Sequence, residues 1–162
     1  MARLNATELV GIVLDEGSFV SWDEPPVTPA GGVSADYAAE LAAAREKSGV
    51  DEAIITGEGT INGRRVAVVA GEFRFLAGSI GVAAAQRLTD AIERATLEGL
   101  PLLAGPASGG TRMQEGTVAF LSMVKITNAV VAHRRAGLPY LVYLRHPTTG
   151  GVFASWGSMG HV

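Results

Sequence analysis

Two glycine pairs have the residue type and spacing to stabilise a negative charge through backbone amides. Gly109 and Gly110 follow an apolar run at 102–107, and Gly150 and Gly151 follow another at 140–144. In open α/β sheets, ligands bind where strands end and helices begin, and glycine lets a ligand approach exposed N–H groups there. The four glycines are therefore candidate donors to an oxyanion. A tight turn with positive φ, or a phosphate cradle, would use the same residues.

Side-chain nucleophiles have less support in the sequence. Ser108, Ser155 and Ser158 lie near the glycines, but no Gly-x-Ser-x-Gly motif occurs. Asp90 and Glu93 fall inside a periodic helical segment and are interpreted as residues of its solvated face. The sequence therefore offers little support for a nucleophilic mechanism.

We predict no metal site in this chain. Cysteine is absent, which excludes disulfides, thiol catalysis and a cysteine-ligated zinc, and the spacing of His133, His146 and His161 fits no common zinc pattern. His146 and His161 flank the second glycine pair and are interpreted as structural or exposed. Glu115 lies at the start of a predicted helix, where a carboxylate can simply cap the helix.

The bulk composition is that of one layered α/β domain. The chain has 162 residues, of which 48% are hydrophobic, and a mean hydropathy of +0.26. Aromatic residues make up 6% and glycine accounts for 21 positions, so backbone packed closely on backbone is expected in the core. No run approaches the roughly 20 uninterrupted apolar residues of a membrane span, and no signal-peptide pattern opens the chain. We expect a cytoplasmic protein without membrane contact.

The net charge of −3 is unevenly distributed. Residues 1–60 carry a net charge of −8, whereas residues 61–162 carry +5. The second part could attract an anionic ligand, although scattered arginines on solvated helix faces would give the same balance. No basic run is interleaved with aromatic residues, so nucleic acid is not an expected partner.

Hydrophobic periodicity predicts alternating strands and helices. Strands are expected at 53–59, 65–71, 102–105 and 140–144, and helices at 34–48, 80–98 and 114–135. Asn62-Gly63 between the first two strands predicts a hairpin, and apolar strands separated by helices predict a parallel sheet.

Two parts are expected along the chain. Residues 1–49 are predicted to be an amino-terminal arm and helix, and residues 50–162 the principal domain. The apolar segment 150–162 lacks a terminating signal, so we expect the domain to be truncated.

Three segments in order carry a family resemblance. Residues 73–81, 107–116 and 147–155 resemble successive motifs of the carboxyltransferase β component of acetyl-CoA carboxylase and its fused relatives. The resemblance is good over residues 50–162 and weak before them. It implies an α/β fold of the crotonase-like (ClpP/crotonase) kind, with repeated ββα units, and assembly as a homo- or hetero-oligomer.

The resemblance also implies a reaction and its partners. Carboxybiotin supplied by a carrier protein would give its carboxyl group to the α-carbon of an acyl-CoA, as in malonyl-CoA formation for fatty acid biosynthesis. The implied donors to the enolate oxygen are the amides of Gly109 or Gly110 and of Gly150 or Gly151. The implied partners are a complementary α-type carboxyltransferase half, the biotin carboxyl carrier protein and biotin carboxylase.

The same resemblance assigns a substrate-binding set. The acyl-CoA site would be lined by Phe75, Gly78, Ser79 and Gly81. Arg112 would position a phosphate or carboxylate, or would instead pair with the carboxylate three positions along.

The chain departs from the family in lacking a four-cysteine zinc ribbon, and in having His146 and His161 where the family commonly has Asp. Two alternatives remain open: a crotonase-like acyl-CoA decarboxylase, and a non-catalytic piece that binds CoA or an assembly partner.

Overall fold

The computed structural model describes residues 4–162, so residues 1–3 of the predicted arm lie outside the described residues. Residues 4–162 form five strands and five helices, with short 3₁₀ turns at Leu76–Gly78 and Met113–Glu115 and a π-helical turn at Phe153–Gly157. Their bounds are α1 (Ala6–Val13), β1 (Val20–Ser21), α2 (Ala35–Ser48), β2 (Ile54–Ile61), β3 (Arg64–Gly71), α3 (Val82–Leu97), β4 (Leu102–Gly105), α4 (Gly116–Arg135), β5 (Tyr140–Val142) and α5 (Gly150–Val152).

The strands form one mixed sheet in the order β1-β2-β3-β4-β5. The first three strands are antiparallel neighbours, whereas β3, β4 and β5 run parallel. Asn62 and Gly63 both adopt positive φ, 49° and 74°, as the tight hairpin between β2 and β3 requires. The predicted alternation of strands and helices is therefore confirmed, and the parallel arrangement is confirmed for β3 to β5.

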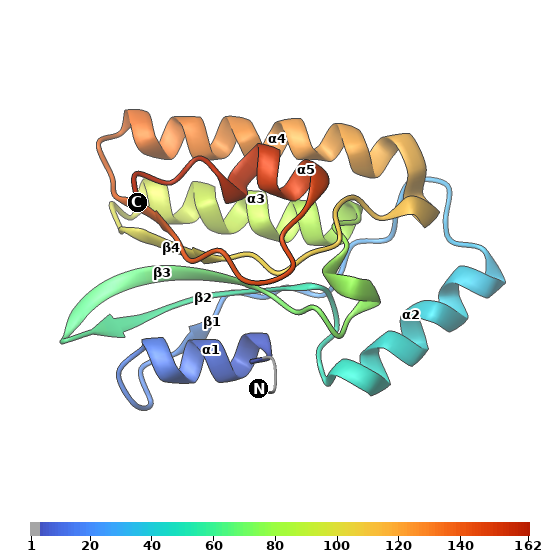
Figure 1. Cartoon of the computed structure of the whole chain (residues 1–162), viewed down its shortest axis with the longest axis horizontal. Helices are drawn as coiled ribbons and strands as arrows, with labels where there is room; N and C mark the ends of the chain where they lie inside the picture. The colour runs from blue at the N-terminus through green and yellow to red at the C-terminus, as the bar shows by residue number, and fades with distance from the viewer. Residues whose placement is uncertain (1–3) are drawn as a thin grey trace.

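Helices α3 and α4 cover one face of the sheet, with α4 outermost in Figure 1. The β2-β3-α3 segment makes one complete ββα unit, and two further βα units follow it. Leu88 and Ile92 of α3, Ile126 of α4 and Leu102 of β4 are all fully buried in the main core. Because each strand then turns back into a helix on this face, the intervening loops all come to the same edge of the sheet.

The amino-terminal segment belongs to the same body as the sheet. Asn5 and Glu8 form a reciprocal capping box that starts α1, and Leu9 and Val10 of this helix are buried against the face opposite α3. Strand β1 pairs with β2. Within residues 4–49 of the predicted arm and helix, α1 therefore packs on the sheet, because its apolar side finds its core partners there.

Helix α4 is also long and apolar in composition. Together with the preceding turn, the described residues Met113–Arg135 form a 23-residue segment that by length and composition alone could cross a membrane, with 39% of its apolar window buried. Our expectation from uninterrupted apolar runs did not identify it, since Lys125 interrupts the segment. In the fold, Met123 and Ile126 bury against the rest of the main core, as in the core helices of globular proteins.

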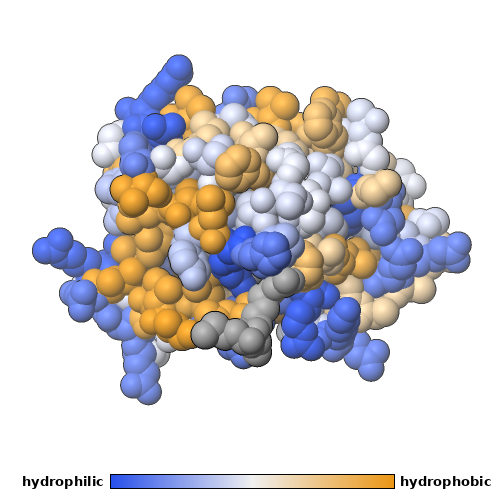
Figure 2. Space-filling model, viewed as in Figure 1, coloured by the Kyte–Doolittle hydropathy of each residue, from blue (hydrophilic) through white to orange (hydrophobic). Residues whose placement is uncertain are grey.

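An apolar groove of about 420 Å³ lies between α1 and the last three strands. Its lining is almost entirely aliphatic, with Leu9 and Val13 on the helix side and Leu103, Leu141 and Val162 on the other. Figure 2 shows the corresponding apolar surface beside the amino terminus. Within residues 4–162, helix α1 covers only part of this face of the sheet.

Candidate functional site

Three loops lie side by side where the parallel strands end. They are the first loop (72–81, from β3 to α3), the second loop (106–115, from β4 to α4) and the third loop (143–149, from β5 to α5). Parallel bridges join Ile80 to Thr111 and Ser108 to Thr148, so the second loop pairs with both of its neighbours. This edge is the usual place for ligands in sheets with parallel strands.

The two predicted glycine turns are in contact. The amide of Ser108 donates to the carbonyl of Pro147 at 2.7 Å, and the amide of Thr149 donates back to the carbonyl of Ser108 at 3.1 Å. A Cβ on Gly110 would lie 4.0 Å from the carbonyl oxygen of Thr149. The structure therefore brings together the two turns that the sequence placed in equivalent topological positions.

The amides of the first glycine pair are already used. Gly109 donates its N–H to the carbonyl of Ala77 at 2.9 Å, and Gly110 donates to Oγ of Ser108 at 3.0 Å. The amides of Gly150 and Gly151, at the start of α5, have no hydrogen-bond partner among residues 4–162. The sequence predicts one donor from each pair. Internal pairing uses both amides of the first pair in this structure and neither of the second, so the donor roles stay predictions.

The first loop presents amides that the sequence analysis missed. Leu76 and Ala77 adopt left-handed conformations with φ of 42° and 55°, a strained state for residues with a Cβ. Ala77 is exposed, and neither amide has a partner among the described residues. No local signal predicts this pair, since left-handed turns ordinarily favour glycine or asparagine. Strain of this kind clusters at functional sites, which makes these two amides candidate donors.

The predicted substrate-binding residues of the first loop are mostly packing residues. Phe75 is fully buried. A Cβ on Gly78 would meet the carbonyl oxygen of Ala107 at 2.1 Å, and one on Gly81 would meet Oε1 of Glu115 at 2.3 Å. These glycines let the first and second loops approach closely. The structure thus gives Phe75, Gly78 and Gly81 interior positions in place of the predicted lining of a ligand surface.

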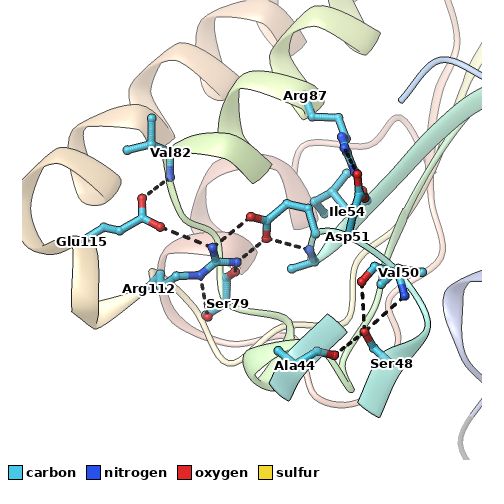
Figure 3. A network of polar contacts seen from close by, with 12 residues as sticks. Ala44, Ser48, Val50, Asp51, Ile54, Ser79, Val82, Arg87, Arg112 and Glu115 are labelled. Carbon is cyan, nitrogen blue, oxygen red and sulfur yellow. Dashed lines mark hydrogen bonds and ion pairs between the residues drawn. The ribbon is translucent and has the colours of Figure 1, made fainter. Parts of the chain in front are cut away.

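Arg112 lies inside a buried ion-pair network. Its side chain is 1% exposed and pairs with Glu52, itself 3% exposed, and with Glu115 at 3.3 Å (Figure 3). Its Nε donates to Oγ of Ser79 at 3.3 Å. The predicted contact of Arg112 with a ligand phosphate stays a prediction, and the guanidinium is bonded to Glu52, Glu115 and Ser79 within the described residues. The alternative pairing with the carboxylate three positions along is confirmed.

The network changes the electrostatics of its members. Burial alone would lower the pKa of Arg112, but hydrogen bonds and charge from Glu52 raise it above its ordinary value. Burial, followed by the hydrogen bond to Glu115, raises the pKa of Tyr37 to about 12. Glu115 accepts from the amide of Val82 at 2.5 Å, so it caps α3 and not its own helix as predicted. The guanidinium and the phenol therefore keep their protons near neutral pH.

The remaining polar candidates lie outside this cluster. Asp90 and Glu93 are exposed on α3, as expected. His146 is exposed, and Nδ1 of His161 accepts from the amide of Tyr140 at 3.0 Å. Within the described part of the chain, no group of three or more His, Asp or Glu side chains is arranged to hold a metal ion.

Comparisons with family models and with curated proteins all point to the same protein family. The chain matches the carboxyl transferase domain over residues 4–162. Over all its 162 residues it is 67% identical to the probable biotin-dependent acyl-coenzyme A carboxylase beta3 subunit of Mycobacterium tuberculosis, of which it covers 32%. Over 161 residues, 98% of this chain, it is 41% identical to the acetyl-coenzyme A carboxylase carboxyl transferase subunit beta of Synechococcus, of which it covers 55%. The chain thus spans between a third and about half of these curated relatives.

Solved structures share the fold. A transcarboxylase 12S structure with methylmalonyl-coenzyme A and methylmalonic acid bound aligns with a TM-score of 0.81 and 27% identity, over 98% of this chain and 28% of that chain. A Pseudomonas malonate decarboxylase hetero-tetramer in complex with malonate aligns with a TM-score of 0.71 and 24% identity, over 94% of this chain and 55% of that one, and shows the fold alone. These likenesses confirm the predicted crotonase-like α/β fold. Together with the match over residues 4–162, they show that the chain belongs to the carboxyl transferase domain family.

Proposed function

We propose that this chain forms part of the carboxyltransferase site of a biotin-dependent acyl-CoA carboxylase. The observation that carries the proposal is the pair of unpartnered amides at Gly150 and Gly151, beside the second loop. Relatives named as carboxylase β subunits support it, as does a related fold with a bound acyl-CoA. The finer assignment, to acetyl-CoA and malonyl-CoA formation for fatty acid biosynthesis, is part of the same proposal.

The chemistry requires donors at a developing oxyanion more than it requires a catalytic side chain. Carboxybiotin would supply the carboxyl group. Its N–C bond would be lost and the α-proton of the acyl-CoA would pass to the ureido nitrogen, which balances the new C–C bond. The enolate intermediate concentrates charge on the thioester oxygen. The amides of Gly150 and Gly151 stabilise that charge, because preformed donors need no reorganisation during the reaction.

The first loop supplies further donors from the opposite side of the second loop. Leu76 and Ala77 have amides without partners among residues 4–162, and the carbonyl of Ala77 holds Gly109 in place. The three loops would therefore hold two sets of donors, one for each carbonyl-bearing reactant. Proximity of the two reactants then contributes the rest of the rate enhancement.

The complete site needs other polypeptide segments. We include in the proposal a complementary α-type carboxyltransferase half, the biotin carboxyl carrier protein and biotin carboxylase, working in a cytoplasmic oligomer. The names of the relatives, which describe them as subunits of acyl-CoA carboxylases, support this arrangement.

A substitution that removes one amide tests the proposal. Gly151→Pro deletes the N–H in the first turn of α5, where an intrahelical partner is not required, so the helix can persist. Gly151→Ala is the matched control, since it keeps the amide and adds the Cβ that both variants share. That Cβ would lie 3.3 Å from Oγ1 of Thr111, so the hydroxyl must shift by a few tenths of an ångström in either variant. In the complete protein with its carrier, we expect kcat for carboxyl transfer to fall about 10²–10³-fold in the proline variant only.

Three results would refute the proposal or redirect it. If the wild type and Gly151→Pro have equal kcat and equal melting temperatures, the amide of Gly151 does not stabilise the oxyanion. Release of CO₂ from a carboxylated acyl-CoA, without biotin and without transfer, would favour the decarboxylase. If the complete protein binds CoA but catalyses neither reaction, the non-catalytic CoA-binding alternative would be favoured.

A further inference from the structure

A buried polar cluster joins four distant segments behind the candidate site. Its members are the carboxylates of Glu52 and Glu115, the guanidinium of Arg112, the phenol of Tyr37 and the hydroxyl and carbonyl of Ser79. The side chains of Arg112, Glu52 and Glu115 are 1%, 3% and 5% exposed. The proposed chemistry assigns none of these side chains a contact with substrate, so it leaves the cluster without a role.

The guanidinium of Arg112 ties the second loop to the first. Its Nη2 donates to the carbonyl oxygen of Ser79 at 2.7 Å, and its Nε donates to the hydroxyl of the same residue. Its backbone amide donates to the carbonyl of Ile80 at 2.9 Å. Figure 3 shows Arg112 lying between Ser79 and Glu115. This side chain thus bridges the two loops, in addition to their backbone hydrogen bonds.

Glu52 sets the orientation of that guanidinium. Its two oxygens accept from Nη1 at 3.0 Å and from Nη2 of Arg112, which is the bidentate geometry that fixes both distance and plane. Tyr37, from α2, accepts from Nη1 at 3.3 Å and donates to Glu115. Every nitrogen of the guanidinium therefore has a partner. The carboxylate of Glu52 holds the guanidinium in the orientation in which it binds Ser79.

We infer that Glu52 and Tyr37 are positioning residues that act through Arg112 to hold the first and second loops in register. The strained pair Leu76–Ala77 and the turn at Gly109 lie within a few residues of the contacts. If the guanidinium tilts, the bonds from Gly109 to Ala77 and from Ile80 to Gly110 lose their support. The donors of the proposed site then move, although no residue that would touch substrate has changed.

A neighbouring ion pair provides the comparison. Asp51 pairs with Arg87 at 2.8 Å, and the side chain of that arginine is 6% exposed. Arg87 donates to the carbonyls of Ile54 and Glu24, and it makes no hydrogen bond to the loops at 72–81 and 106–115 among the described residues. Asp51→Asn therefore weakens the pair between a half-exposed carboxylate and a buried arginine, which keeps Asp23 as a second partner at 3.4 Å, and leaves the loops untouched.

The test compares Glu52→Gln with Asp51→Asn in the complete protein. We expect Glu52→Gln to lower kcat for carboxyl transfer at least ten-fold, and to speed amide hydrogen exchange at least ten-fold at Ile80, Gly109 and Arg112. Asp51→Asn should keep kcat and these three exchange rates within two-fold of the wild type. Arg112→Lys keeps the positive charge but loses the planar guanidinium that binds a carboxylate through two nitrogens, so it should behave like Glu52→Gln.

The inference is overturned if Glu52→Gln leaves the three exchange rates unchanged. It is also overturned if Glu52→Gln raises exchange equally throughout the chain, or if Asp51→Asn lowers kcat as much, since either result describes a general loss of stability. The activity readout rests on the proposed function. A wild-type protein without carboxyl transfer refutes that function, and the exchange comparison then still decides the role of Glu52.

Discussion

Replacing Gly78 by alanine tests whether the first and second loops depend on direct backbone contact. Gly78 has φ +66°, and an added Cβ would meet the carbonyl oxygen of Ala107 at 2.1 Å. Gly99, after α3, has φ +67° with no atom within 4 Å of the same position. Each glycine donates its amide to a carbonyl three residues back. The pair therefore differs mainly in what surrounds the new methyl group.

The two substitutions share one cost and differ in another. A left-handed residue with a Cβ costs about 1–2 kcal/mol, and the reduced entropy of the unfolded chain returns about 0.4–1 kcal/mol. That balance of roughly 1 kcal/mol applies to Gly78→Ala and Gly99→Ala alike. Overpacking adds about 1–3 kcal/mol at Gly78 only, because a backbone carbonyl cannot swing aside as a flexible side chain can. We expect Gly78→Ala to cost about 2–4 kcal/mol.

Urea unfolding of the two variants measures the difference. With a slope of about 1–3 kcal/mol per molar urea, the midpoint of Gly78→Ala should fall below that of Gly99→Ala by on the order of 1 M. Amide exchange at Ser108 and Gly109 should also rise in Gly78→Ala alone. Equal midpoints for the two variants would refute the reasoning, since close approach of the two loops would then carry no energetic weight.

Three further predictions concern buried side chains. Burial lowers the pKa of His133 below 6.5, so the unfolded chain takes up the proton first and the free energy of unfolding should fall as pH drops below 6.5. His133→Asn should flatten this dependence in urea titrations at several pH values, and an unchanged dependence would contradict this reasoning. Arg112→Met should lower the free energy of unfolding by about 3–5 kcal/mol, because it leaves buried carboxylates unpaired. Adding Glu52→Leu to this variant should restore part of the lost stability. A double variant less stable than Arg112→Met would contradict this. Phe75→Ala should cost about 3–5 kcal/mol in thermal unfolding, because the ring is fully buried, and an unchanged melting temperature would contradict its interior role.

Most of the architecture follows from local patterns in the sequence. The Asn62-Gly63 hairpin, the glycine that ends α2 and the apolar runs of β3 and β4 all lie where periodicity and turn chemistry predict them. Strand β1 and the packing of α1 were missed. Strand β1 has only two residues, which is too short to show the alternation typical of a strand. The packing of α1 depends on partners in β2 and β3, which lie far along the chain.

The candidate site was predictable in position but not in detail. The topology of parallel strands places the two glycine turns at one edge, and their contact follows from it. The carbonyl of Ala77 and the hydroxyl of Ser108 accept from the amides of the first glycine pair, and the glycine pattern itself does not predict these two bonds. The burial of Arg112 likewise depends on Glu52, 60 positions earlier, so no local window could separate a ligand-binding arginine from a structural one.

Glycine serves two distinct physical needs in these loops, and the sequence does not distinguish them. At Gly78 and Gly81 the missing side chain makes room for another loop, whereas at Gly150 a φ of +54° turns the chain into α5 and leaves an amide exposed. A glycine-rich motif therefore marks both the donors and the packing that holds them. Because the packing glycines sit beside the network of Arg112, substitutions there should disturb the proposed catalysis through geometry, before any contact with substrate is lost.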